Sequence, residues 1–92
     1  MEVTFDPAKN GRNIRERGLS FQRAADFDFE TALVLEDTRH DYGEIRYRAL
    51  GKIDEDLHSL VFTLREGEPL RVISLRRANR RERKSYEEAV KS

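Results

Sequence analysis

Residues 57–76 read LHSLVFTLR, EGEP and LRVISLR in succession, and they decide the fold. Both outer segments alternate apolar and polar residues, as a β-strand with one buried face does. The Gly and Pro between them favour a tight turn. If Gly67 and Glu68 form a two-residue turn, the chain makes an antiparallel hairpin. Its expected cross-strand pairs are Arg65–Leu70, Thr63–Val72, Val61–Ser74 and Ser59–Arg76.

This register gives the hairpin two unlike faces. The apolar face, a floor for helices, is expected to hold Leu60, Phe62, Leu64, Ile73 and Leu75. The other face mixes small residues with arginine: Val61, Thr63, Arg65, Val72, Ser74 and Arg76. The preceding strand, expected at residues 44–53, places Arg46 and Arg48 together on one side. A face with several arginines suits anion binding, although an ordinary solvent-facing side of a sheet has the same pattern.

Helix signals precede the sheet. Asp6 and Pro7 start a helix expected at residues 7 to about 17, and Gly18 suits its left-handed end. Ser20 caps a second helix expected at roughly 21–26, whose apolar face would pack on the sheet. A short extended segment at residues 3–5 comes before both helices. An apolar piece at 32–35 and a polar loop at 37–43 follow them and lead to three strands expected at 44–53, 57–65 and 70–76.

The last predicted element is a helix. Asn79 and Glu82 have the spacing of an N-cap and its N3 acceptor, and the helix that they open includes Tyr86 and frays near Ser92. The sequence therefore predicts one α+β domain over residues 1–92. Two N-terminal helices would pack on a mainly antiparallel meander, and a short C-terminal helix would follow it.

Composition limits the classes of function. The 92 residues are enough for one domain, and 39% of them are charged. The absence of cysteine excludes disulfides and thiolate metal sites and fits a reducing compartment. No apolar stretch approaches the roughly 20 residues of a membrane span, and the N-terminus has no signal-peptide pattern. We therefore expect a cytoplasmic protein with no membrane partner.

Charge is unevenly distributed along a chain whose formal net charge is zero. Residues 24–45 carry seven acids against one base, whereas residues 65–84 carry eight bases against three acids. Most of the basic residues are arginine, which makes bidentate contacts with phosphate. The basic segment therefore predicts a phosphate-binding face. A surface that docks an acidic protein, or one that is merely solvated, is the alternative.

Few kinds of catalysis fit these residues. The two histidines, His40 and His58, do not form an HxxxH or HExxH motif, and we expect neither a metal nor a cofactor. No nucleophile-elbow motif surrounds any serine. RNA, however, supplies its own nucleophile, the ribose 2′-OH. Its cleavage needs a proton acceptor, a proton donor and positive charge near the phosphate, which an arginine-rich site can provide.

A series of short motifs points to a known family. They are Phe5-Asp6-Pro7-Ala8-Lys9, Asn13, Gly18-Leu19-Ser20-Phe21, Arg39-His40-Asp41-Tyr42-Gly43-Glu44, Arg46, Gly51, Phe62-Thr63, Arg71-Val72-Ile73-Ser74-Leu75-Arg76-Arg77-Ala78, Glu82 and Tyr86. In this order and spacing, the chain resembles nearly end to end the BrnT family of ribonuclease toxins from type II toxin-antitoxin systems. The resemblance implies a RelE-like fold and cleavage of mRNA that inhibits translation. It also implies a BrnA-type antitoxin that forms a ribbon-helix-helix dimer. The toxin would reach operator DNA only through this antitoxin.

The resemblance further implies roles for single residues. Arg76, in the pattern Ser74-x-Arg76-x-Ala78, would stabilise the scissile phosphate. Arg65, on the same predicted face of the hairpin, would be a second phosphate clamp or would merely flank the turn. Glu82 would act as a base or only cap its helix. Tyr86 would stack on a base, donate a proton or simply pack. Contacts with RNA are expected from Lys9, Arg46, Arg48, Arg77 and Arg80.

One position departs from the family pattern. The family usually has a histidine where this chain has Arg17, and an arginine does not exchange protons near neutral pH. His40, in the 37–43 loop, is then the histidine with a plausible role in proton transfer, whereas His58 is expected to be a buried or edge residue of its strand. The alternative function is a non-catalytic binding module whose arginine face docks an antitoxin or RNA without cleavage.

Overall fold

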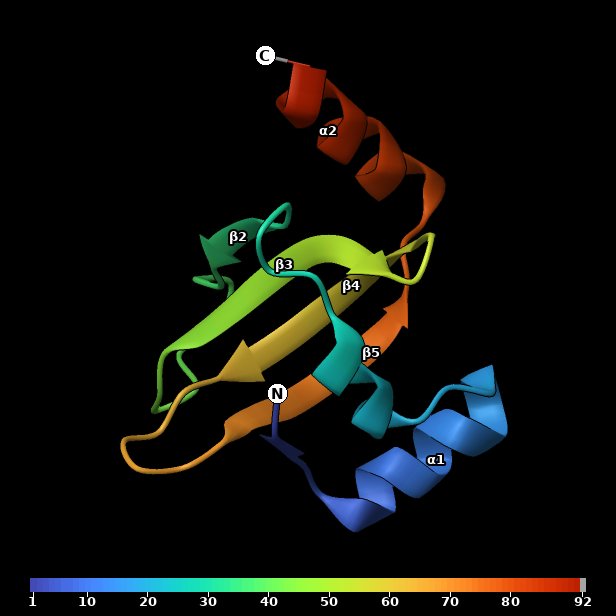
Figure 1. Cartoon of the computed structure of the whole chain (residues 1–92). Coiled ribbons are helices and arrows are strands. Elements are labelled where there is room, and N and C mark those ends of the chain that lie inside the picture. Colours follow the sequence, from blue (N-terminus) through green and yellow to red (C-terminus); the bar gives the residue numbers. More distant parts are fainter. Residues whose placement is uncertain (92) are drawn as a thin grey trace.

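A computed structural model describes residues 1–91 and has an α+β architecture (Figure 1). Five strands form one sheet in the order β1-β5-β4-β3-β2. The strands are β1 (Val3–Thr4), β2 (Leu33–Glu36), β3 (Arg46–Ile53), β4 (Asp56–Thr63) and β5 (Leu70–Arg77). The helices are α1 (Pro7–Arg17), the 3-10 helix η1 (Phe21–Asp26) and α2 (Arg80–Lys91). The fraying expected at Ser92 lies outside the described residues.

The N-terminal region contains one α-helix, where two helices were predicted. α1 begins after Asp6 and ends at Gly18, whose φ of 66° is the left-handed conformation expected there. Residues 21–26 instead form the 3-10 helix η1, and six residues are too few for a stable α-helix. Phe21 and Ala24 of η1 are nevertheless buried against the sheet, as their spacing predicted.

Two strands extend the sheet beyond the three predicted ones. The extended segment at residues 3–5 contributes β1, which pairs in parallel with β5. The apolar piece at 32–35 contributes β2, which pairs antiparallel with β3. The antiparallel meander from β2 to β5 is therefore confirmed, and β1 makes the sheet mixed. Among residues 1–91, no helix has the length and apolar character needed to cross a membrane.

The β4–β5 hairpin has the predicted register at one end only. Ser59 lies opposite Arg76 and Val61 lies opposite Ser74, which confirms two of the expected pairs. Beyond Val61 a β-bulge shifts the pairing by one residue, so that Thr63 loses its predicted partner. A bulge of this kind inserts an extra residue into one strand and changes the face to which its neighbours point.

The bulge exchanges the predicted faces of two residues of β5. Val72 pairs with Phe62 and is buried in the core, whereas Ile73 lines a cavity on the other side of the sheet. Leu64, also expected in the core, follows the end of β4 and is 60% exposed. These three face predictions are wrong, because strict alternation does not reveal where a bulge or a strand end falls.

The core fills one face of the sheet, where Leu60, Phe62 and Leu75 are all at most 5% exposed. Gly51, in the middle of β3, has no side chain because the ring of Phe27 takes its place: a Cβ there would lie 2.5 Å from that ring. Figure 1 shows η1 lying across the sheet, α1 beside β5, and α2 projecting past the end of β5. On the opposite face, the open face, Tyr86 of α2 packs beside Leu57, and a groove lies between residues of β2 and α2.

Candidate functional site

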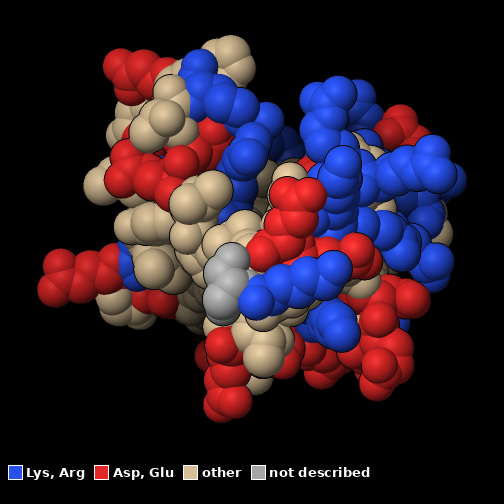
Figure 2. Space-filling model, turned by 90° about the horizontal axis from the view of Figure 1, so that it is seen from above, with Lys and Arg blue, Asp and Glu red and all other residues tan. Residues whose placement is uncertain are grey.

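The open face of the sheet contains a groove of about 720 Å³. Five arginines and two acids line it: Arg39, Arg46, Arg48, Arg76 and Arg81, with Asp37 and Glu82. Ser59 and Ser74 contribute hydroxyl groups from neighbouring strands. In the view of Figure 2, the Lys and Arg side chains gather toward one side of the molecule. A concave surface with this excess of guanidinium groups is suited to a phosphate-bearing ligand.

Arg76 stands near the end of β5 and is held by Glu82 from the first turn of α2. Its Nη1 and Nη2 donate to the two carboxylate oxygens at 2.7 and 2.9 Å, and Nη1 also donates to the carbonyl oxygen of Arg77 at 3.3 Å. A guanidinium has five N–H donors, so Nε–H and one Nη2–H donate to no described residue. These two lie on one edge of the group, where they match two oxygens of a phosphate.

Glu82 is fixed by a second set of bonds. Its Oε1 accepts a hydrogen bond from the backbone N–H of Asn79 at 2.9 Å, and the Asn79 side chain accepts one from the N–H of Glu82 at 2.8 Å. This reciprocal capping box confirms the predicted start of the last helix. The hydrogen bonds from Arg76 hold the pKa of Glu82 below its ordinary value. Glu82 is therefore ionised and a weak proton acceptor, an arrangement that favours orienting Arg76 over acting as a base.

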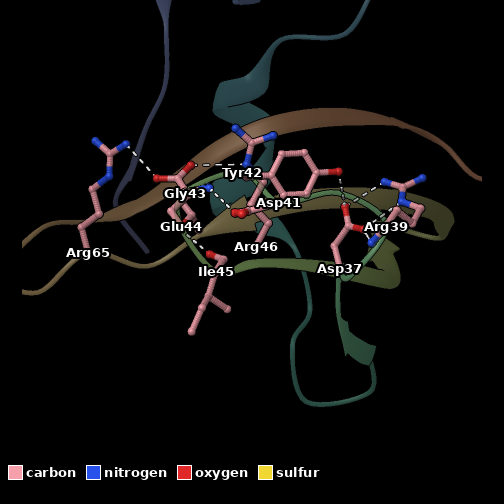
Figure 3. Close-up of polar contacts among 10 residues, drawn as sticks. Asp37, Arg39, Asp41, Tyr42, Gly43, Glu44, Ile45, Arg46 and Arg65 are labelled. Atoms are coloured by element: carbon pink, nitrogen blue, oxygen red, sulfur yellow. Dashed lines mark hydrogen bonds and ion pairs between the residues drawn. The ribbon is translucent and has the colours of Figure 1, made fainter.

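A loop between β2 and β3 presents a second paired arginine (Figure 3). The side chain of Asp37 is only 1% exposed and accepts hydrogen bonds from Nε and Nη2 of Arg39, both at 2.8 Å. The hydroxyl group of Tyr42 donates to the same carboxylate at 3.2 Å. The bonds from Arg39, first, and from Tyr42 keep the pKa of Asp37 well below its ordinary value. Asp37 thus ties the loop together and aims Arg39 at the groove.

The same loop orients Arg46. The guanidinium carbon of Arg46 lies 4.0 Å from the ring centroid of Tyr42, a cation–π contact. Nε of Arg46 donates to Glu44 at 3.3 Å, and the other carboxylate oxygen of Glu44 accepts a hydrogen bond from Arg65 at 3.1 Å. Arg65, the predicted second phosphate clamp, is therefore engaged at the back of Arg46 and does not line the groove (Figure 3).

Arg48 and Arg81 differ from the other groove arginines. Neither makes a side-chain hydrogen bond or ion pair with any residue from 1 to 91. Arg48 is close enough to Glu82 to contribute to the lowered pKa of that carboxylate. The groove therefore combines three arginines held by acids, whose directions are fixed, with two that are free to meet an incoming anion.

Some predicted site residues lie elsewhere. Tyr86 is 7% exposed, packs beside Leu57, and donates its hydroxyl hydrogen to the carbonyl oxygen of Thr31 at 3.0 Å. Its environment is that of a packing residue. His40 is exposed on the loop and does not line the groove, but its ring lies edge-on to that of Tyr42, which does, at 5.6 Å between centroids. His58 is buried, as predicted.

The predicted RNA-binding residues divide into two sets. Arg46 and Arg48 lie in the groove with Arg76. Arg77 follows Arg76 directly and therefore points to the opposite side of β5, and Arg80 is exposed at the start of α2; neither lines the groove. Lys9 lies on α1 at a second, smaller cavity.

Sequence reasoning missed several groove residues: Asp37, Arg39, Tyr42, Ser59, Arg81 and Ser85. Asp37 in a polar loop was the available signal, because an Asp side chain often accepts a hydrogen bond from the backbone N–H two residues on, as Asp37 does from Arg39 at 3.2 Å. Within the part of the chain that the structure describes, no three His, Cys, Asp or Glu side chains gather as metal ligands.

The chain is thus a small α+β protein with an arginine-lined groove on one side of its sheet. Over residues 5–82 the chain matches the family described as ribonuclease toxin, BrnT, of type II toxin-antitoxin system. The crystal structure of the Brucella abortus ribonuclease toxin BrnT is similar, with a TM-score of 0.64 and 32% sequence identity over 87% of this chain and 99% of that chain. A search of curated proteins gave no match.

This chain belongs to the BrnT family of type II ribonuclease toxins. Membership confirms the family predicted from the motifs and implies an RNA substrate and a protein antitoxin.

Proposed function

We propose that this chain is a metal-independent endoribonuclease that cleaves mRNA in the groove and so inhibits translation in the cytoplasm. The observation that carries the proposal is Arg76, whose guanidinium has one edge held by Glu82 and another edge open. Such an arginine offers positive charge at a fixed position and needs no reorganisation when charge develops on a bound phosphate.

The proposed reaction uses the RNA as its own nucleophile. The 2′-oxygen attacks the neighbouring phosphorus while its proton passes to a base, and the bond from phosphorus to the 5′-oxygen breaks as that oxygen gains a proton. The products are a 2′,3′-cyclic phosphate and a 5′-hydroxyl. Negative charge builds on the non-bridging oxygens in between, and Arg76 with Arg48 would stabilise it there.

Three residues were predicted to move protons, and the geometry favours one of them. Glu82 is committed to Arg76 and Asn79, and the hydroxyl group of Tyr86 is committed to Thr31. His40 is exposed beside Tyr42, which lines the groove, and an imidazole can both accept and donate a proton. We therefore assign proton transfer to His40, positioning of Arg76 to Glu82, and anchoring of α2 to Tyr86.

The remaining predicted cations would guide the RNA outside the groove. Arg65, Arg77, Arg80 and Lys9 lie beyond its lining, where they add favourable charge along a longer strand. The proposed antitoxin is of the BrnA type, a ribbon-helix-helix dimer that alone contacts operator DNA. The five-stranded mixed sheet, with η1 packed on one face and α2 beside the groove on the other, supports assignment of the fold to the RelE-like toxins.

A non-catalytic binding module is the second candidate. It is favoured by one observation: both acids that line the groove are bound to arginines and are poor proton acceptors. Such a module would hold RNA or an antitoxin on the same arginines and cleave nothing.

The test is incubation of the purified chain with mixed-sequence RNA in EDTA, with analysis of the product ends. We expect cleavage that leaves 2′,3′-cyclic phosphate ends, and a rate about 10²- to 10³-fold lower for Arg76→Ala because a fixed charge is lost. The matched control is Arg23→Ala, since Arg23 also pairs with a carboxylate at 2.8 Å but lies on η1. Cleavage by Arg76→Ala at the parental rate contradicts its role, and salt-dependent binding without cleavage supports the binding module.

A further inference from the structure

A second cavity lies between α1 and β5, outside the groove. Its volume is about 230 Å³. Three cations of α1 line it with one acid: Lys9, Arg12 and Arg17, with Glu16. The cavity therefore has an excess of positive charge of its own, on an element that contributes nothing to the groove lining.

The two cavities meet at the bulge in β5. Ile73 and Ser74 line both of them, so a ligand that crosses this part of β5 passes from one to the other. Ser74 precedes Arg76 by two residues, a distance of roughly 7 Å along a strand. A strand of RNA with one phosphate at Arg76 therefore needs to extend only a short way to reach the cavity beside α1.

The cationic side chains of this cavity make few polar contacts within the part of the chain that the structure describes. Arg12 makes a solvent-exposed ion pair with Glu16 at 3.6 Å, which is weak at such exposure. The side chains of Lys9 and Arg17 have no hydrogen-bond or ion-pair partner among residues 1–91. Arg17 lies in the last turn of α1, where a positive charge interacts favourably with the helix dipole. Lys9, in the first turn, opposes that dipole, so helix stability does not explain its presence there.

We propose that the cavity between α1 and β5 is a second RNA subsite, which binds a backbone phosphate neighbouring the one held by Arg76. Lys9 and Arg17 would contact the phosphate oxygens. The inference rests on the proposed function for the identity of the ligand, and it adds that RNA must span β5 to bind fully. Short RNAs that fill only the groove would not reach Lys9 or Arg17.

The test compares binding of two uncleavable 2′-O-methyl RNAs, a trinucleotide and a twelve-residue strand. For the variant Lys9→Ala/Arg17→Ala we expect roughly tenfold weaker binding of the long RNA and less than about a twofold change for the trinucleotide. The slope of log affinity against log salt for the long RNA should fall by about 0.7 for each cation removed. The control is Arg15→Ala, because Arg15 lies on the same helix but not at the cavity.

Three results would overturn the subsite: equal loss for both RNAs, no loss for the long RNA, or the same loss in the control. Circular dichroism melts of each variant establish that the fold is retained. Because neither RNA can be cleaved, this binding test is independent of catalysis. A length-dependent loss without any ribonuclease activity would support the subsite and contradict the cleavage proposed above.

Discussion

The two faces of the sheet come from the same strands and have opposite properties. On the covered face, Leu60 and Leu75 are completely buried in an apolar core. On the open face, their neighbours Ser59, Ser74 and Arg76 line a groove with four other arginines. Because successive side chains of a strand point to opposite sides, a single hairpin supplies both. Residues of the core and residues of the groove thus alternate along the chain.

The comparison shows that side chains are held in defined positions on the open face as well as in the core. A row of free arginines would repel one another and adopt many rotamers. Here Asp37, Glu44 and Glu82 hold three of them in place, and Arg48 and Arg81 remain available. Mutations should therefore separate into those that unfold the protein and those that only weaken RNA binding or cleavage.

The largest effect is expected from Leu60→Ala, which opens a cavity in the core. The free energy of unfolding should fall by about 2–5 kcal/mol in urea denaturation, while activity per folded molecule stays at the parental level. Val61→Ala, the next residue on the open face, should cost less than about half as much because Val61 is only half-buried. Equal losses would contradict the division between the faces.

The double variant Arg48→Ala/Arg81→Ala should weaken RNA binding and leave the stability of the fold nearly unchanged. Each lost guanidinium should weaken RNA binding roughly tenfold, because a charged hydrogen bond to phosphate disappears. The free energy of unfolding should change by no more than about 0.5 kcal/mol, because neither side chain makes a hydrogen bond or an ion pair with the described residues. Fluorescence anisotropy and urea denaturation measure the two quantities. A large loss of stability with unchanged affinity would show that these arginines belong to the fold.

The pairs on the open face should make stability depend on pH. Since the pKa of Asp37 is lowered from its ordinary value of 3.8, its ion pair contributes fully above that value and is lost as pH falls through the depressed pKa. Asp37→Asn should therefore be less stable than the parent at pH 7, and the gap should narrow in acid. Urea denaturation between about pH 7 and pH 3 measures it. If the difference in free energy of unfolding between Asp37→Asn and the parent stays constant with pH, the loss of stability comes from the shape of the asparagine side chain and not from the lost charge.

The smallest effect is expected from Tyr86→Phe. Loss of the hydrogen bond to Thr31 should lower the free energy of unfolding by about 1 kcal/mol. If Tyr86 anchors α2, the cleavage rate should change little. A drop of tenfold or more in rate, at unchanged stability, would instead restore this tyrosine to a role in proton transfer.

Local signals in the sequence predicted much of the fold. The caps of α1 and the capping box of Asn79 and Glu82 depend on residues close together in the chain. The β4–β5 hairpin was also predicted, but residues 64–69 connect its strands, so the two-residue turn and the Arg65–Leu70 pair are wrong. Alternation placed Arg46 and Arg48 together on one side of their strand and Arg76 on the polar face of the hairpin, and the structure brings all three into the groove. The motifs also identified the family.

The rest depended on contacts between distant segments. The bulge at Ile73 and the 3-10 form of η1 depend on how the elements pack together. Such packing produces no periodic pattern of apolar residues in the sequence. Arg65 lies on the predicted arginine face only if β4 continues past Thr63, and β4 ends there. Arg39 lines the groove because of the path of its loop. The loop bends so that the carboxylate of Asp37 accepts two hydrogen bonds from the Arg39 side chain.

The most direct test of the account is to map where RNA binds. Amide and arginine Nε–H signals of the ¹⁵N-labelled protein would be followed by NMR during titration with an uncleavable 2′-O-methyl RNA. We predict that the largest shifts occur at Arg48, Arg76 and Glu82 in the groove, with little change at Arg23 on η1. Shifts centred on η1, or spread evenly over all exposed arginines, would contradict the claim that the open face of the sheet is the RNA site.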